Sequence, residues 1–235
     1  LTEFKAQEIM VDGHWYENKF STVTPLANQS LNFTLSDSDL ILPLADDMPA
    51  HVINIMPHHI TTQHTVESVS IVNNHFEANT TFAKVVVAER YHDLGHGLGI
   101  IKGFNMKAGA IGSTVAHDSH NVIIAGVDDK DMLLAAETLK KIGGGQVVVI
   151  DGQVTAMPLP IGGLMSDQDY QTTIDQNRAL DNAFSRISDV PFDPFLTLSF
   201  MALPVIPSLK ITDQGLFDFD KFSFIDIQDT GEFKS

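Results

Sequence analysis

The stretch GAIGSTVAHDSHNVIIAGV (residues 109–127) contains two apolar runs that flank a polar motif. The runs GAIGSTVA and NVIIAGV are short and rich in β-branched residues, so they predict two strands. The fold class depends on which helices and strands precede and follow these two strands in the chain. The motif between them, VAHDSHN (115–121), is the first candidate site.

The motif VAHDSHN has three interpretations. On a straight strand, His117 and Ser119 would face one side and Asp118 and His120 the other, so convergent chemistry requires a turn or bulge. Ser119 could be a nucleophile with a histidine as base, although no G-x-S-x-G elbow surrounds it. His117, His120 and Asp118 could bind a metal ion. Otherwise the motif is a polar turn.

Strand-like runs outnumber helical ones along the chain. FAKVVVAE (82–89) contains a continuous apolar run of strand length, as a strand buried on both faces does. Residues 129–142 predict a helix, with Asp128 and Asp129 as N-cap candidates and Gly143 after its end. Further strand-like segments are 51–56, 65–72, 146–150, 153–157 (a hairpin with 146–150), 196–206 and 216–227.

A second helix is predicted to start at Ser166, with Asp169 three residues later as a capping box. Apolar residues then recur at helical spacing from Tyr170 to Ile187. Many strands with about two principal helices predict an α+β fold.

The first 55 residues differ in character. FKAQEIMVDGHWYENKF (4–20) predicts a hairpin that turns at Asp12-Gly13, and a lone hairpin needs a partner to pack on. Residues 21–50 are interpreted as a connection with a strand near Leu40–Leu42. We therefore expect two units, 1–55 and 56–235.

Composition and charge exclude several partners. The 235 residues carry 14 basic and 30 acidic side chains, a formal net charge of −16, and no cysteine. Nucleic acid and anionic membranes require clustered basic residues, so neither is expected as a partner. No apolar run is long enough to span a membrane. Because the chain begins with Leu1, we expect a processed product or a fragment.

ERYHDLGHGLG (89–99) is the second polar cluster. His92 and His96 have the i, i+4 spacing of helical metal ligands, but three glycines oppose a helix. The stretch also lacks the Gly-Lys-Ser/Thr ending of a phosphate-binding loop. We interpret it as a tightly turned or flexible loop. MPHHITTQH (56–64) adds three histidines, interpreted as exposed residues near the domain junction.

Four longer stretches are more specific than these motifs. In order and spacing they resemble the C-terminal region of bacterial and archaeal adenine deaminases, which belong to the metal-dependent amidohydrolase superfamily. The resemblance covers roughly residues 80–218. The stretches are KGFNMKAGAIGSTVAHDSHNVIIAG (102–126), DMLLAAETLKKIGGGQVVVIDG (131–152), LPIGGLMSD (159–167) and DPFLTLSFMALPVIPSLKITDQGLFD (193–218).

The resemblance implies that the catalytic barrel of the enzyme precedes this region. In the family that barrel holds a two-metal centre, usually of manganese or iron, and no His-x-His pair of such a centre occurs in these 235 residues. The intact enzyme would hydrolyse adenine to hypoxanthine and ammonia. The opening hairpin resembles the last hairpin of the family's flanking β-sandwich.

For this chain the resemblance implies no metal and no catalytic residue, with the barrel of the same protein as partner and adenine as substrate. A homo-oligomer and a cytoplasmic location are also expected. Loop 115–121 would either help close the purine pocket or hold the domain interface together. Tyr91 and His92 stand where the family typically has two histidines. The pocket or interface candidates are His117, Asp118, Ser119, His120, Asn121, Glu89, Arg90 and His92.

Two other functions remain open at this point. A non-catalytic module of the same ancestry would bind a purine or a protein. A self-sufficient hydrolase would use residues 117–120 and His92 or His96 around one metal ion. Only this last function predicts metal in the purified chain.

Overall fold

A computed structural model describes residues 8–16, 31–45 and 48–230. Its centre is an eight-stranded sheet in the order β12-β11-β9-β10-β7-β8-β3-β4. Only the β3–β8 pair is parallel. The strands are β3 (Ala50–Ile55), β4 (Thr62–Glu67), β7 (Phe82–Ala88), β8 (His96–Lys102), β9 (Ala110–Ser113), β10 (Val122–Gly126), β11 (Gly145–Ile150) and β12 (Gln153–Pro158).

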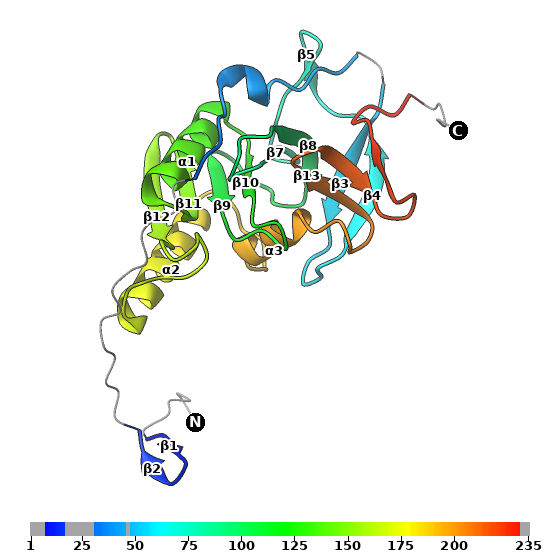
Figure 1. Ribbon diagram of the computed structural model, residues 1–235. Helices are drawn as coiled ribbons and strands as arrows, with labels where there is room; N and C mark the ends of the chain where they lie inside the picture. Colours follow the sequence, from blue (N-terminus) through cyan, green and yellow to red (C-terminus); the bar gives the residue numbers. More distant parts are fainter. Residues whose placement is uncertain (1–7, 17–30, 46–47, 231–235) are drawn as a thin grey trace.

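Both faces of the sheet are covered (Figure 1). Helix α1 (Asp129–Ile142) and the segment with Leu31 and Phe33 pack on one face. Helices α2 (Tyr170–Phe184) and α3 (Pro194–Met201) pack on the other, together with β13 (Leu209–Thr212) and β14 (Gly215–Asp218). The central strands are therefore buried on both faces, which explains their continuously apolar sequences.

The helix predicted at 129–142 is confirmed with both of its bounds. The Asp128 side chain accepts a hydrogen bond from the Asp131 backbone N–H, and Gly143 ends the helix with φ of 75°. The predicted hairpin at Asp151-Gly152 is also confirmed by the pairing of β11 with β12. The residues of the turn and of the helix caps are sufficient to predict both elements.

The strand predicted at 196–206 is wrong, because residues 194–201 form helix α3. The Asp193 carboxylate accepts the backbone N–H groups of Phe195 and Leu196, and Pro194 occupies the first turn. Both are helix-start signals. Six of the eight residues in PFLTLSFM are apolar, and such a run shows no helical period.

Two further predictions need correction. The strand expected near Leu40–Leu42 is replaced by a 3-10 helix, η1 (Asp37–Leu40). Asp39 Oδ2 accepts hydrogen bonds from the Ser36 backbone N–H and hydroxyl at 2.8 and 2.6 Å, which closes this turn. Helix α2 begins at Tyr170 rather than near Ser166, because Asp169 caps the N–H groups of residues 171 and 172.

The remaining strands of the described residues form small antiparallel sheets. They are β1–β2 (Met10–Val11, His14–Trp15), β5–β6 (Ile71–Val72, His75–Phe76) and β13–β14–β15, the last strand being Ser223–Ile225. The first hairpin turns at Asp12-Gly13 as predicted, whereas residues 4–7 and 17–20 lie outside the described residues. Strand β3 pairs within the main sheet, and the boundary at residue 55 stays a prediction.

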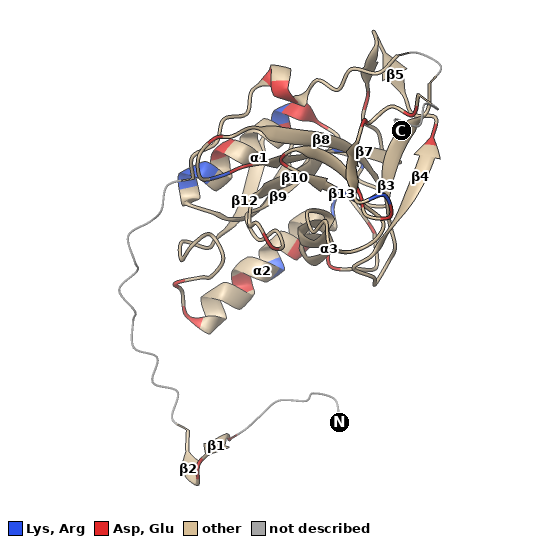
Figure 2. Ribbon diagram, turned by 45° about the vertical axis from the view of Figure 1, so that its right-hand side comes forward, with Lys and Arg blue, Asp and Glu red and all other residues tan. Residues whose placement is uncertain are grey.

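Strands with three helices confirm the α+β class. Figure 2 marks more acidic than basic positions on the ribbon, in keeping with the net charge of −16. Within the described ranges, no helix combines the length and the apolar character that a membrane crossing needs.

Candidate functional site

Three loops leave the main sheet at the same end because of its strand register. Ala88, the last residue of β7, pairs with Val122 at the start of β10 and with His96 at the start of β8. The end of β9, the start of β11 and the end of β12 are in register with them. The loops at this end are therefore 89–95, 114–121 and 159–166.

The turn between β13 and β14 (212–215) reaches the same place. A Cβ on Gly97 would overlap the Thr212 carbonyl oxygen, so this close approach requires glycine. Gly97 lies in β8, which corrects the prediction that all of 89–99 is a loop. Asn121 Nδ2 donates to Asp213 Oδ1 at 3.2 Å. We call the four segments 89–95, 114–121, 159–166 and 212–215 the loop end.

The motif VAHDSHN forms a turn between two strands. The His120 backbone N–H donates to the Ala116 carbonyl at 2.6 Å, and His120 has φ of 54°. The His117 backbone N–H donates to the Ser199 carbonyl of α3 at 3.1 Å. The turn is thereby tied to a helix that lies far from it in the sequence.

The side chains of the motif point to different neighbours. The His117 ring lies 4.7 Å, between centroids, from the Phe200 ring of α3, and 6.3 Å from the His120 ring. Among the described contacts, no histidine hydrogen-bonds to Ser119 Oγ, which instead accepts the Asn121 N–H at 3.4 Å. The geometry required of a serine nucleophile and its base is therefore missing.

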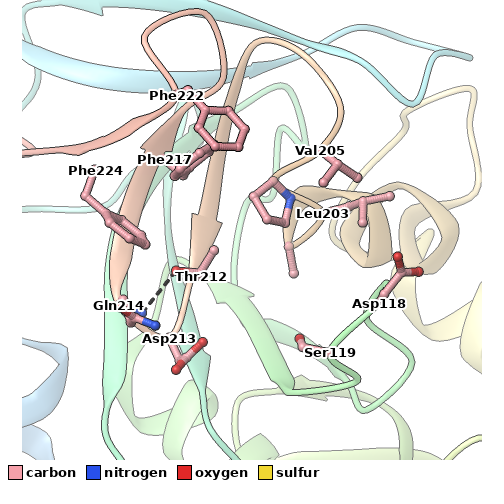
Figure 3. Close-up of a pocket in the computed structure, with 12 residues that line it drawn as sticks. Asp118, Ser119, Leu203, Val205, Thr212, Asp213, Gln214, Phe217, Phe222 and Phe224 are labelled. Carbon is pink, nitrogen blue, oxygen red and sulfur yellow. Dashed lines mark hydrogen bonds between the residues drawn. The ribbon is translucent and has the colours of Figure 1, made fainter.

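Asp118 and Ser119 line a pocket of about 410 Å³ (Figure 3). The pocket lining is mostly apolar and includes the carboxylates of Asp118 and Asp213, which suits a flat ligand with N–H donors. The other residues that line it are Ala202, Leu203, Pro204, Val205, Thr212, Asp213, Gln214, Phe217, Phe222 and Phe224.

Arg90 is buried in the loop end, with 2% of its surface exposed. Its Nη2 donates to the Tyr91 hydroxyl at 2.7 Å and to the Gly162 carbonyl at 2.9 Å. Its Nε and Nη1 have no acceptor among the described residues, and neither does Nδ1 of His120 have a partner there. Burial and then the charge of Arg90 lower the pKa of His120 below its usual value.

Glu89 shapes the loop that follows β7. Its carboxylate accepts the backbone N–H groups of Tyr91, His92 and Leu94 at 2.8, 2.7 and 3.4 Å. Burial alone would raise the pKa of Glu89, but these hydrogen bonds hold it below its usual value. Glu89 therefore acts as an ionised cap of its own loop.

His92 and His96 do not assemble a metal site with the motif. The His92 side chain is 74% exposed, and its Nδ1 lies 3.6 Å from Glu89 Oε1. Across the described ranges, no three His, Asp or Glu side chains are placed to share a metal ion. The two-metal centre implied by the family resemblance has no fitting donor set in this part of the chain.

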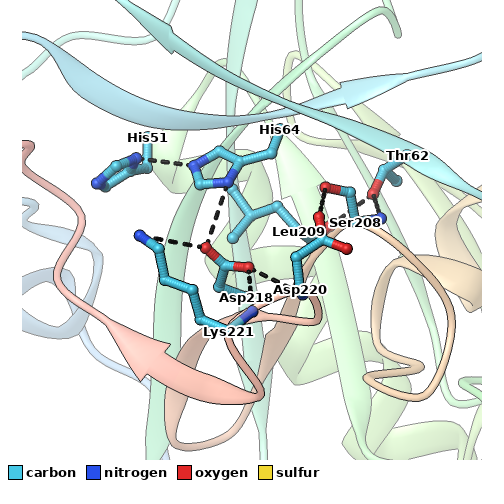
Figure 4. A network of polar contacts seen from close by, with 8 residues as sticks. All are labelled: His51, Thr62, His64, Ser208, Leu209, Asp218, Asp220 and Lys221. Atoms are coloured by element: carbon cyan, nitrogen blue, oxygen red, sulfur yellow. Dashed lines mark hydrogen bonds and ion pairs between the residues drawn. The ribbon is translucent and has the colours of Figure 1, made fainter.

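His64, one of the three histidines of MPHHITTQH, belongs to a separate polar cluster (Figure 4). Its Nε2 hydrogen-bonds to His51 Nδ1 at 2.8 Å, and its Nδ1 lies 3.6 Å from Asp218 Oδ2. Asp218 is 2% exposed and also accepts the backbone N–H groups of Asp220 and Lys221. Burial is the main cause that lowers the pKa of His51 and of His64.

The structure adds residues that no motif singles out. The Thr114 hydroxyl donates to the Gly163 carbonyl at 2.6 Å and accepts the Gly145 N–H at 2.8 Å. This bond fastens loop 159–166 to the loop end. Thr114, Gly163 and Asp213 all lie within the stretches that carry the family resemblance, but their contacts depend on the strand order.

Comparisons with known proteins agree on one family. The model of the adenine deaminase C-terminal domain matches residues 59–223. An adenine deaminase of Leuconostoc mesenteroides is 69% identical over 97% of this chain and 42% of its own length. Adenine deaminase 1 of Oenococcus oeni is 58% identical over 97% of the chain and 41% of its own length. An adenine deaminase of Geobacillus kaustophilus is 44% identical over 87% and 36%, respectively.

The chain thus spans less than half the length of the curated relatives it matches. The family resemblance inferred for residues 80–218 is confirmed. The family model covers the turn with VAHDSHN, loop 89–95 and the 212–215 turn, so the loop end lies within the matched region. The chain belongs to the adenine deaminase C-terminal domain family.

Proposed function

We propose that this chain is the C-terminal part of an adenine deaminase and that its loop end packs on the catalytic domain. The intact enzyme converts adenine and water to hypoxanthine and ammonia. Its relatives are named for this activity, and each is more than twice as long as the region matched here. The metal donors and the groups that perform the hydrolysis belong to that longer protein.

The convergence of the loop end carries the proposal. The stretches that resemble adenine deaminases are spread over more than 100 residues, yet they contribute three of the four segments at one end of the sheet. Gly97 and Gly163 also lie there, and at both positions a Cβ atom would overlap a neighbouring residue. Loops positioned at one end of a rigid sheet are the usual place for binding.

Exposed apolar side chains support an interface in this part of the molecule. Leu94 of loop 89–95 is 75% exposed, and Phe222 and Val205, which line the pocket, are 74% and 63% exposed. Val205 and Phe222 share one pocket, and exposed apolar surface of this kind is typical of an interaction site. A catalytic domain in the same protein is the partner that the length of the relatives supplies.

The pocket beside Asp118 gives loop 115–121 its proposed role. Asp118 and Ser119 offer acceptors to the N–H groups of a purine edge, and Phe217 offers an apolar surface. Packing over the barrel mouth would exclude water from the purine, which strengthens the hydrogen bonds made there. A homo-oligomer and a cytoplasmic location stay predictions.

The deciding experiment measures conversion of adenine to hypoxanthine by the intact protein and by the 235-residue chain, each supplied with manganese or iron. Turnover by the intact protein alone is expected. Activity of the chain alone would show that residues 117–120 form a complete active site and would overturn the proposal.

Variants of the intact protein test the role of the loop. Asp118→Asn and the double change His117→Ala, His120→Ala are expected to raise KM or lower kcat about tenfold, the effect of losing one hydrogen bond to the substrate. Asp37→Asn, an exposed change in η1, is the control. Unchanged kcat and KM in both loop variants would restrict the loop to the domain interface.

One alternative has its own support, because the pocket is formed entirely by this chain. A non-catalytic module of the same ancestry would bind a purine there. Titration of the chain with adenine by calorimetry separates the two. Saturable binding by the chain, with no deamination by the intact protein, would favour the module.

A further inference from the structure

Arg90 carries a buried charge with no carboxylate partner among the described residues. The guanidinium uses only Nη2, which donates to the Tyr91 hydroxyl and the Gly162 carbonyl. Nε and Nη1 are covered and have no acceptor, and Nδ1 of the neighbouring His120 has no partner either. Among the described residues, two nitrogen atoms of Arg90 and one of His120 thus have no partner.

The acidic side chains nearest in the sequence are already engaged. The Glu89 carboxylate caps the N–H groups of its own loop. Asp93 accepts the backbone N–H and the hydroxyl of Thr34, both at 2.8 Å. Among the described residues, neither carboxylate hydrogen-bonds to the Arg90 guanidinium, whose only acceptors are the Tyr91 hydroxyl and the Gly162 carbonyl.

A buried cation of this kind is costly unless a carboxylate reaches it. The guanidinium is a planar fork of N–H donors that matches a carboxylate with two parallel hydrogen bonds. Carbonyl groups supply dipoles but no negative charge. The missing element is therefore an anion with two oxygen atoms rather than another backbone group.

We propose that Arg90 forms an ion pair with an Asp or Glu side chain of the catalytic part of the same enzyme, and that His120 donates a further hydrogen bond to it. The inference rests on the proposed function, because it needs the catalytic domain at the loop end. The relatives extend well beyond the matched region, so the polypeptide that would supply the carboxylate exists in them. Arg90 is then a positioning residue of the interface.

Two glycines and the partly exposed Tyr91 cover Arg90. Gly163, with φ of +74°, lies directly against Nη1, and Gly162 contributes a carbonyl but no side chain. The Tyr91 ring stacks 4.8 Å from the guanidinium carbon and is 46% exposed. The proposal therefore requires Tyr91 and the two glycines to move when the carboxylate reaches Nε and Nη1.

The experiment compares Arg90→Met in two contexts, the 235-residue chain and the intact protein, by thermal unfolding. In the chain, removal of an uncompensated charge should leave the midpoint unchanged or raise it. In the intact protein, loss of the ion pair should lower the midpoint by roughly 5 °C and strand the partner carboxylate. Arg178→Met, on the exposed face of α2, is the matched control and should change neither.

Equal destabilisation in both contexts would place the acceptor within the 235 residues and overturn the proposal. An unchanged midpoint in the intact protein would also overturn it. A second test uses charge reversal: Arg90→Glu in the intact protein should lower its midpoint, and an acidic-to-Lys change in the catalytic domain should restore it. Failure of the proposed function appears separately, as absence of adenine turnover while the opposite responses to Arg90→Met persist.

Discussion

Asp218 and Arg90 are equally buried, each with 2% of its surface exposed, yet their surroundings are opposite. The Asp218 carboxylate is surrounded by donors from its own chain: two backbone N–H groups, the His64 ring and the Lys221 ammonium. Among the described residues, two nitrogen atoms of Arg90, Nε and Nη1, have no acceptor. Donors within the described residues satisfy the Asp218 carboxylate, whereas part of the Arg90 guanidinium has no acceptor there.

The comparison separates charges that stabilise this chain from charges that serve an interface. A buried polar group is expected to be satisfied, so an exception requires an explanation. Asp218 ties the β13–β14–β15 sheet to the β3–β4 pair through His64 and His51. Arg90 lies where the loops converge, and on the proposal above its missing acceptor comes from another polypeptide segment.

The largest effect is expected for Asp218→Ala. The change leaves the N–H groups of Asp220 and Lys221 without their acceptor, so the free energy of unfolding of the chain should fall by about 2–4 kcal/mol. Urea unfolding measures it. Asp37→Ala, at an exposed position, should change the stability by less than about 0.5 kcal/mol. A similar small loss for Asp218→Ala would end the comparison.

Lys210 is an intermediate case that sharpens the comparison. It is 0% exposed, and its Nζ donates to the carbonyls of Ile60 and Phe200 at 2.9 and 3.0 Å. Burial lowers its pKa from 10.5 to about 8. Between these two values the folded side chain is neutral while the unfolded one still binds a proton, so unfolding takes up a proton and stability rises with pH.

Unfolding of the chain at several pH values from 7 to 10.5 should therefore show a rise in the free energy of unfolding of about 3 kcal/mol that Lys210→Met abolishes. Lys130→Met, at an exposed position, is the control for the loss of one lysine. The same pH profile in both variants would mean that Lys210 is not the group responsible.

Thr114→Val tests how loop 159–166 is held over Arg90. The valine has nearly the same shape but leaves the Gly145 N–H and the Gly163 carbonyl without partners, so a loss of about 1–2 kcal/mol is expected. Hydrogen exchange should show faster opening of residues 159–166. Thr114→Ser, which keeps the hydroxyl, should protect that loop as the natural residue does.

The smallest effect is expected from His51 and His64 in acid. Their pKa values are lowered mainly by burial, so below pH of about 6.5 the unfolded chain binds protons that the folded chain resists. Stability should fall as the pH drops from 6.5 towards the folded pKa values. Asp218, Asp220 and Asp229 oppose this loss and Lys221 adds to it. His51→Gln should flatten the profile, and a slope unchanged by it would exclude His51 as a contributor.

Local chemistry explains which elements could be predicted from the sequence. Helix 129–142 has an N-cap, an amphipathic pattern and a terminal glycine, and the hairpin of β11 and β12 has an Asp-Gly turn. Helix α3 has its start signals in Asp193 and Pro194, but its apolar sequence hides the period. The cap signals were the better guide there.

The candidate site could be predicted only in part. The motif VAHDSHN and Glu89-Arg90 are recognisable as polar clusters, yet their meeting depends on the pairing of β7 with β10. Pairing between distant strands is a property of the whole sheet and has no local signature. That Nε and Nη1 of Arg90 have no acceptor among the described residues is equally invisible in the sequence, because it depends on how the loops around Arg90 fold.

The hairpin of β1 and β2 contains Trp15, the single tryptophan of the sequence, with 62% of its surface exposed. Its indole fluorescence therefore reports on this one hairpin alone. In the isolated chain the emission should resemble that of indole in water and be readily quenched by iodide. A shift of the emission to shorter wavelength in the intact protein would show that the hairpin is covered there. Trp15 would then be an optical probe of assembly.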